Sequence, residues 1–159
     1  MNEPLVSITV CVRNGAGWIE GCLDSLLSQT YPNTEILVVN DGSTDGAESM
    51  LDPYHDPEGA RGPPLCVHHQ PPLGLSAGRQ WALEQAKGEW VAITDIDVRP
   101  EQDWISNMVA EIHPVAENER VVAITGRTVF EQAKDLVSRL RSVEIASKYR
   151  SRPRRTSLA

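Results

Sequence analysis

Two groups of acidic residues lie directly after short apolar segments of the chain, and their spacing suits the binding of a metal ion. Asp95 and Asp97 follow the apolar segment 90–94, and the acid-and-glycine turn 41–43 follows the apolar segment 36–39. In an extended backbone the side chains of residues i and i+2 lie on the same face, so the two carboxylates would repel one another unless a cation neutralised them. Carboxylate oxygens suit Mg²⁺ or Mn²⁺, which keep coordination positions open for substrate phosphates. The sequence therefore indicates a metal-assisted phosphate site, although an isolated Asp-x-Asp is more often an ordinary turn that caps the next helix.

The segments around these acids alternate between strand and helix patterns. Runs of apolar, β-branched residues predict strands, and apolar residues at helical spacing predict helices. The predicted strands are 5–12, 36–39, 65–69, 90–94 and 121–125, and the predicted helices are 17–29, 45–51, 75–87, a helix that starts at Pro100 and a last helix over 130–149. This alternation predicts an α/β fold, a three-layer sandwich in which helices cover both faces of a mostly parallel sheet.

The turns that follow the predicted strands contain the candidate functional residues. In a mostly parallel sheet, ligands bind outside the carboxyl ends of the strands. The sequence places polar and glycine-rich turns at these positions, namely Arg13-Asn14-Gly15, Asp41-Gly42-Ser43, the loop 71–78, Asp95-Ile96-Asp97 and Gly126-Arg127. We therefore expect these turns to converge on one site.

A dinucleotide-binding site is one alternative to the metal-assisted phosphate site, and it fits the first of these turns only in part. Gly15 and Gly17 open a helix after a strand, and Asp41 ends the next strand. The fingerprint of such sites has a third glycine at a fixed position, which Glu20 occupies here. A negative charge in that first helical turn would lie near the expected pyrophosphate and disfavour it.

A serine hydrolase is the other alternative. The segment 74–78 matches G-x-S-x-G, in which the serine must stand on a sharp turn between a strand and a helix. Pro71 and Pro72 separate Ser76 from the preceding strand, and the only histidine that follows is His113, next to a proline. The match is short and its context is unfavourable.

The composition is that of an ordinary globular protein of one domain. The 159 residues are 40% apolar and 23% charged, which excludes a disordered chain and a disulfide scaffold. No apolar run approaches the roughly 18 residues that a membrane span needs. Three cysteines without a CxxC pair, and a start without a basic segment or secretory signal, predict reduced thiols and a cytoplasmic location.

The charge is unevenly distributed along the chain. The net charge is −7, but residues 139–159 contain seven basic side chains and one acidic side chain. We therefore divide the chain into a body over 1–138 and a basic helix end and tail over 139–159. The acidic body argues against nucleic acid as a partner, whereas the basic tail suits contact with phosphate or with the cytoplasmic face of an anionic membrane.

Several longer motifs follow one another in a fixed order. The segment 23–30 reads LDSLLSQT, the segment 35–45 reads EILVVNDGSTD, and the segment 86–89, AKGE, precedes the Asp-x-Asp. Together these motifs resemble those of the family 2 glycosyltransferases of the GT-A fold. The resemblance covers residues 5–112 and concerns the amino-terminal part of these enzymes, which binds the nucleotide sugar. It implies transfer of a sugar from a nucleotide-diphospho-sugar, with Mg²⁺ or Mn²⁺ and with inversion, to an acceptor that is a sugar, a lipid-linked molecule or a protein.

The resemblance also implies the roles of individual residues. Asp41 matches the acid that hydrogen-bonds the nucleotide base, Arg79 matches an arginine near the diphosphate, Asp97 matches the direct metal ligand, and Asp95 lies nearer the ribose and the metal. The residues expected to bind the nucleotide sugar are Cys11, Val12, Arg13, Asn14, Asp41, Gly42, Ser43, Arg79, Asp95 and Ile96, and those expected to bind the metal are Asp97 and Asp95.

The sequence departs from the family pattern at several positions. Asn40 replaces the commoner first aspartate, Cys11 stands where proline or threonine is usual, and Gly78 and Gln80 replace alanine and asparagine around the arginine. The catalytic base of the family is expected beyond Ala159, and Glu131 and Asp135 are better interpreted as surface charges. The remaining alternative is therefore a truncated, non-catalytic module of the same fold, in which an uncovered sheet edge would favour homo-oligomers.

Overall fold

The computed structural model describes residues 3–116, all of which belong to one compact unit. Within these residues, four parallel strands form one sheet in the order β3-β2-β1-β4. The strands are β1 (Val6–Val12), β2 (Thr34–Asp41), β3 (Leu65–Gln70) and β4 (Trp90–Asp95). The strands are parallel, so their carboxyl ends meet at one edge of the sheet, and this edge is where the sequence analysis expects the site.

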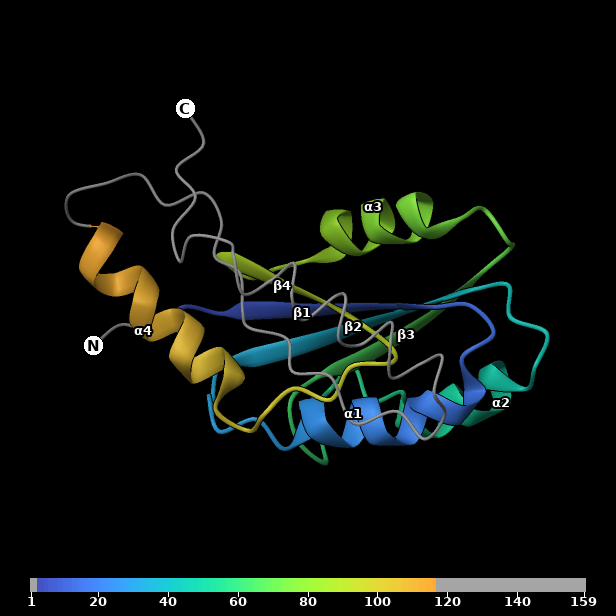
Figure 1. The fold of residues 1–159 in the computed structure, drawn as a ribbon, viewed down its shortest axis with the longest axis horizontal. Helices are drawn as coiled ribbons and strands as arrows, with labels where there is room; N and C mark the ends of the chain where they lie inside the picture. The colour runs from blue at the N-terminus through green and yellow to red at the C-terminus, as the bar shows by residue number, and fades with distance from the viewer. Residues whose placement is uncertain (1–2, 117–159) are drawn as a thin grey trace, which may run out of the picture. The chain divides into compact units, whose positions relative to one another are not determined.

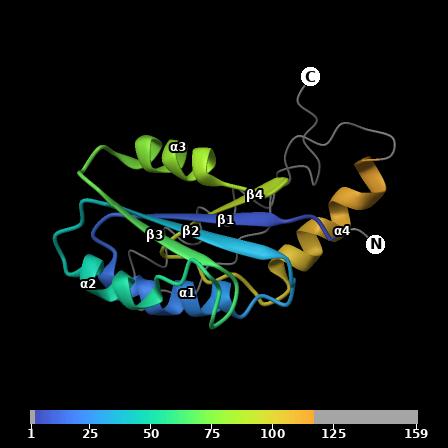
Figure 2. The same ribbon diagram turned by 180° about the vertical axis from the view of Figure 1, so that it is seen from behind.

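Helices cover both faces of the sheet, as the alternation of patterns predicts. The helical segments are η1 (Ala16–Trp18), α1 (Ile19–Leu27), α2 (Ala47–Leu51), η2 (Asp52–Tyr54), α3 (Leu75–Gln85) and α4 (Trp104–Ala116). Figures 1 and 2 show α3 on one face of the sheet and α1 and α2 on the other. The three-layer α/β fold is therefore confirmed. No helix among the described residues combines the length and apolar character needed to cross a bilayer.

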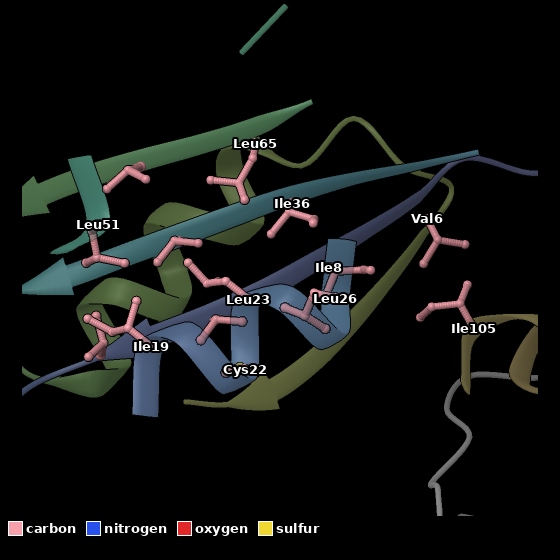
Figure 3. Packing of buried hydrophobic residues seen from close by; sticks show 14 of the residues in the cluster. Val6, Ile8, Ile19, Cys22, Leu23, Leu26, Ile36, Leu51, Leu65 and Ile105 are labelled. Carbon is pink, nitrogen blue, oxygen red and sulfur yellow. The ribbon is translucent and has the colours of Figure 1, made fainter. Parts of the chain in front are cut away.

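The main hydrophobic core lies between the sheet and α1. Alternate side chains of β1, β2 and β3 point toward this layer, as the period of two in a strand requires. They meet the apolar stripe of α1, as Figure 3 shows for Ile8 and Ile36 opposite Leu23 and Leu26, all of them fully buried. All eight residues of β2 are buried, which fits a central strand covered on both faces.

The second face of the sheet is covered by α3, which approaches β1 and β2 closely. A Cβ atom at Gly78 would lie 3.2 Å from Cys11 Sγ and 3.3 Å from Val39 Cγ1. Leu75, at the start of α3, does not share this inward position, because 47% of its surface is exposed.

A buried polar network joins the start of the sheet to the turn before β4. Glu35 Oε1 accepts hydrogen bonds from Ser7 Oγ at 2.6 Å and from the Lys87 amide at 2.7 Å. Ser7 Oγ in turn accepts one from the Gly88 amide at 2.8 Å. Glu35 is 7% exposed. The motif segments 35–45 and 86–89 are therefore joined through the Glu35 side chain and the Lys87 amide, and this network stabilises the fold.

Several boundaries differ from the predicted ones. The strand predicted at 36–39 extends to Thr34 and Asp41, because its polar end residues are buried and hydrogen-bonded. The helix expected from Pro100 begins at Trp104. The preceding residues instead bind the segment that follows α1, where the Gln102 carbonyl accepts from the Thr30 amide at 2.8 Å. The predicted strand 121–125, the predicted helix 130–149 and the proposed division at residue 138 lie outside the described residues.

Candidate functional site

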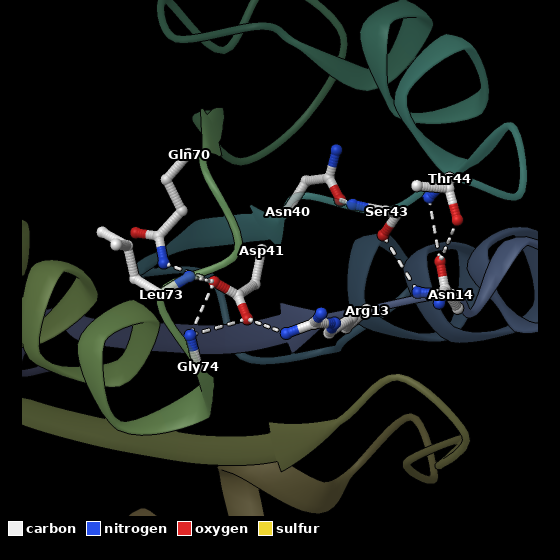
Figure 4. Close-up of polar contacts among 9 residues, drawn as sticks. All are labelled: Arg13, Asn14, Asn40, Asp41, Ser43, Thr44, Gln70, Leu73 and Gly74. Carbon is white, nitrogen blue, oxygen red and sulfur yellow. Dashed lines mark hydrogen bonds and ion pairs between the residues drawn. The ribbon is translucent and has the colours of Figure 1, made fainter.

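Asp41, the last residue of β2, holds the loop that follows β3. Its Oδ1 accepts hydrogen bonds from Gln70 Nε2 at 2.8 Å, from the Leu73 amide at 2.8 Å and from the Gly74 amide at 3.0 Å. Its Oδ2 also accepts from the Gly74 amide and lies 3.5 Å from Arg13 Nη1. Figure 4 shows these donors converging on one carboxylate from three segments of the chain. Asp41 therefore shapes the loop after β3.

The surroundings of Asp41 favour its ionised form. The hydrogen bond from Gln70 lowers the pKa of the Asp41 carboxyl most. Burial acts in the opposite direction, but the amides of Leu73 and Gly74 and the Arg13 guanidinium add to the lowering. The pKa therefore lies below its ordinary value, because donors aimed at a carboxylate stabilise its charged form. The Arg13 guanidinium remains accessible, because 54% of the Arg13 side chain is exposed.

The loops after β1 and β2 are joined by reciprocal hydrogen bonds (Figure 4). The Asn14 amide donates to Ser43 Oγ at 3.0 Å, and Asn14 Oδ1 accepts from the Thr44 amide at 2.9 Å. Asn14 has a φ of 53°, a left-handed conformation that asparagine tolerates better than most residues. Asp45 adds a second link, because it accepts from the Ala16 amide at 2.8 Å. These contacts fix the two loops against each other.

Asn40, which departs from the family pattern, is the centre of a hydrogen-bonded chain that ends at an exposed acid. Asn40 Oδ1 accepts from the Ser43 amide at 3.2 Å, and its Nδ2 lies 2.9 Å from His69 Nδ1. The other ring nitrogen, Nε2, lies 3.2 Å from Asp52 Oδ1. A backbone amide can only donate, so the Ser43 amide fixes the orientation of the Asn40 side chain.

We expect the neutral form of His69 to carry its proton on Nε2. The Asn40 amide nitrogen faces Nδ1 as a donor, so Nδ1 must accept, and Nε2 is left to donate to Asp52. Nitrogen NMR of the imidazole ring at alkaline pH measures the tautomer. Asn40→Asp, which replaces the donor by an acceptor, is expected to shift the proton toward Nδ1; an Nδ1 proton in the unaltered protein would contradict this arrangement.

The Asp-x-Asp segment differs from its expected geometry. β4 ends at Asp95, and the Val98 amide donates to the Asp95 carbonyl at 3.1 Å, so residues 95–98 form a turn. The expectation of one extended backbone through Asp95 and Asp97 is therefore wrong. Both side chains are exposed. Cys22 of α1 lies beneath this turn, because its Sγ donates to the Asp95 carbonyl at 3.8 Å. Burial, together with the charges of Asp97 and Asp95, raises the pKa of the Cys22 thiol to about 12.

Asp95 binds an arginine from the opposite helix layer. Arg79 Nη2, from α3, donates to Asp95 Oδ1 at 3.0 Å. Cys11 is paired with Asp95 in the register of β1 and β4, and burial raises the pKa of its thiol. Cys11 and Gly78, two of the departures from the family pattern, are in contact through the close approach of α3. Cys11 therefore lies beneath the Arg79–Asp95 pair as a packing residue.

The remaining predicted residues support these turns. A Cβ atom at Gly15 would lie 2.9 Å from Val12 Cγ2 and 3.1 Å from Ile96 Cγ2, so Val12 and Ile96 pack around this glycine. Gly42 has a φ of 62° and a Cβ there would lie 2.7 Å from Pro72 Cδ. The loop predicted to bind a ligand and the turn after β2 are therefore in contact.

The structure brings the predicted residues together in pairs and adds residues that the sequence analysis missed. The pairs are Arg13 with Asp41, Asn14 with Ser43, and Arg79 with Asp95. The missed residue is Gln70, together with the amides of the loop 73–74. The position of Gln70 at the end of a strand was the signal that could have identified it.

Neither alternative chemistry has a supporting site among the described residues. Ser76 is an exposed residue in the first turn of α3, and within residues 3–116 no hydrogen bond joins it to a histidine. Gly15 is buried by its neighbours instead of opening toward a pyrophosphate.

The carboxylates at the edge of the sheet fit a divalent cation that is shared with a ligand. Within residues 3–116, no group of three or more His, Cys, Asp and Glu side chains could enclose a metal. Asp95 and Asp97 nevertheless offer exposed carboxylate oxygens, and Mg²⁺ and Mn²⁺ are typically held by one or two carboxylates together with substrate phosphates. The donor set therefore fits an ion that binds together with a phosphate ligand.

The chain is similar to known proteins over most of its length. EpsH of Bacillus subtilis (strain 168) is 38% identical over 109 residues, which cover 69% of this chain and 30% of EpsH. The mannosyltransferase PcManGT from Pyrobaculum calidifontis, solved in complex with GDP-Man and Mn²⁺, is 32% identical with a TM-score of 0.64, over 70% of this chain and 33% of that one. TarS 1–349 of S. aureus, solved in complex with UDP-GlcNAc, is 28% identical with a TM-score of 0.62, over 70% of this chain and 32% of that one.

These comparisons define the fold and the family. The chain spans about a third of the length of each of these three proteins. The structural similarity confirms the GT-A type of α/β fold. The sequence pattern of the family described as glycosyl transferase family 2 matches residues 7–158. This chain therefore belongs to glycosyl transferase family 2.

Proposed function

We propose that this chain is the donor-binding part of a metal-dependent glycosyltransferase, which transfers a sugar with inversion from a nucleotide-diphospho-sugar. The observation that carries the proposal is the convergence of the Asp41 carboxylate and the Arg79–Asp95 pair at the carboxyl edge of the sheet. The structures of PcManGT with GDP-Man and Mn²⁺ and of TarS with UDP-GlcNAc support it, because both proteins share this fold.

Each group of the site has a role that its chemistry supports. Asp41 Oδ2 can accept a base N–H if the exposed Arg13 side chain moves aside, since Oδ1 already has three donors. Arg79 provides a guanidinium, which suits the oxygens of a diphosphate. Asp95 and Asp97 would hold Mg²⁺ or Mn²⁺, whose charge stabilises a departing diphosphate. The carboxylate that deprotonates the acceptor is proposed to lie outside these residues, so this part binds and orients the donor.

Calorimetry of the 159-residue chain with UDP, GDP and dTDP, with and without Mn²⁺, tests this proposal. We expect at least one nucleoside diphosphate to bind, and Mn²⁺ to strengthen its binding. Asp97→Ala is expected to weaken binding in the presence of Mn²⁺ by about tenfold, equivalent to about 1.4 kcal/mol.

The control is Glu58→Ala, which removes an exposed acid from the loop before β3 and should leave nucleotide binding unchanged. Absence of binding by all three nucleotides would refute the donor role and favour the non-catalytic module. An unchanged affinity in Asp97→Ala would refute the assignment of the metal ligand alone.

A further inference from the structure

Asp95 and Arg79, the groups proposed here to meet the metal and the diphosphate, bind each other at the carboxyl edge of the sheet. Arg79 Nη2 and Asp95 Oδ1 are 3.0 Å apart, with 39% and 60% of the two side chains exposed. Each ligand must therefore compete with the partner of the group that it binds.

The backbones on both sides of this pair are fixed, so a rearrangement must occur in the side chains. Gly78 packs α3 against Cys11 and Val39, directly before Arg79. Asp95 is the last residue of β4 in register with β1, and its carbonyl accepts the Val98 amide. The guanidinium can leave the carboxylate by rotation of the Arg79 side chain without movement of α3 or β4.

We propose that the Arg79–Asp95 ion pair makes binding of the divalent cation and of the diphosphate mutually dependent; this inference rests on the proposed function. A cation that binds alone at Asp95 meets the positive guanidinium, and a diphosphate that binds alone at Arg79 meets the negative carboxylate. When both bind, the cation neutralises the charge of Asp95 and the diphosphate neutralises the charge of Arg79. Each ligand therefore increases the affinity for the other by the same factor, as linkage requires.

The proposal distinguishes Arg79 from a residue that only attracts phosphate. If Arg79 only attracted phosphate, its replacement would not change the affinity for the cation in the absence of a nucleotide. In the coupled arrangement, replacement of Arg79 by a neutral residue strengthens binding of the cation at Asp95. Replacement of Asp95 by a neutral residue strengthens binding of the diphosphate at Arg79. The effect is modest, because ion pairs between partly exposed groups are weak; we expect about a threefold change in each dissociation constant.

Electron paramagnetic resonance titration with Mn²⁺ alone tests one side of the pair. Arg79→Gln is expected to bind Mn²⁺ about threefold more tightly than the unaltered chain, and Arg79→Lys, which keeps the charge, should bind it as the unaltered chain does. Arg61→Gln is the matched control, because it removes an equal charge from an exposed loop, with 67% of the side chain exposed. Its Mn²⁺ affinity should be unchanged.

Calorimetry with UDP, GDP and dTDP in the presence of a chelator tests the other side. Asp95→Asn is expected to bind the metal-free nucleotide about threefold more tightly, and to lose the strengthening of nucleotide binding by Mn²⁺. Circular dichroism of each variant checks that the fold is retained.

The outcomes separate the two proposals. If the unaltered chain binds a nucleoside diphosphate with Mn²⁺ but Arg79→Gln binds Mn²⁺ no more tightly than Arg61→Gln does, the coupling is wrong and the proposed function stands. If no Mn²⁺ binding is measurable in the unaltered chain or in Arg79→Gln, the coupling is also wrong. If the unaltered chain binds none of the three nucleotides with Mn²⁺, the proposed function fails and the coupling fails with it.

Discussion

Replacement of Asp41 by asparagine is expected to lower the free energy of unfolding by about 3 kcal/mol, because buried hydrogen bonds to a charged acceptor are lost. Asp41 is 2% exposed and its carboxylate accepts from Gln70 and from the amides of Leu73 and Gly74. An asparagine keeps one oxygen but turns an NH₂ group toward one of these donors. Urea denaturation measures the loss.

The pH dependence of this effect has a definite sign. The folded-state pKa of Asp41 is lowered, so its contribution to stability is complete above the unfolded carboxyl value of about 3.9. It is lost as the pH falls through the lower folded value. The stability difference between the unaltered chain and Asp41→Asn should therefore narrow at acidic pH. Glu58→Gln, at an exposed acid, is the control; an equal loss in both variants would show that the Asp41 contacts contribute nothing specific.

Replacement of Gly88 by alanine is expected to destabilise the fold by about 3 kcal/mol, at the upper end for overpacking. The added Cβ would lie 2.6 Å from the Ser7 amide nitrogen, 2.7 Å from Ser7 Oγ and 2.8 Å from the Leu5 carbonyl oxygen. Two of these atoms belong to the backbone, so a side-chain rotation cannot relieve the contact. The hydrogen bonds of the Ser7–Glu35 network would also be strained. Thermal or urea denaturation measures the effect.

Gly17→Ala is the matched control for this change. A Cβ at Gly17 meets no atom within 4 Å. The substitution should be neutral or stabilise the fold slightly, because alanine restricts the unfolded chain. Equal stabilities of Gly88→Ala and the unaltered chain would show that the turn before β4 can move away from β1.

The sequence was sufficient to predict the layers and to predict that the turns after the strands lie at one edge of the sheet, because these features depend on local patterns. The buried strands β1 and β2 are mostly apolar, and the acids at the strand ends lie where parallel strands must bring them together. The position of α1 could be predicted from its own stripe of apolar residues. The order of the strands was not predicted, because it depends on which crossovers pack best against the sheet.

The details that were missed depend on contacts between distant segments. The hydrogen bonds that Asp41 accepts include two from backbone amides of the loop after β3, and a backbone amide has no signature in the sequence. The turn after Asp95 depends on a backbone hydrogen bond to Val98. The roles of Cys11 and Gly78 depend on the close approach of α3 to β1, which joins segments distant in the sequence.

The position of β4 beside β1 has a consequence for the order of events in folding. Val6 pairs with Thr34 on one side and with Trp90 on the other, so the second pairing closes a far longer loop of chain. Closing a longer loop costs more conformational entropy, and contacts between distant residues slow folding. Arg79 and Asp95 meet only when β4 has docked. A chain that has assembled its first three strands therefore still lacks the pair, and a ligand held there reports the docking of β4.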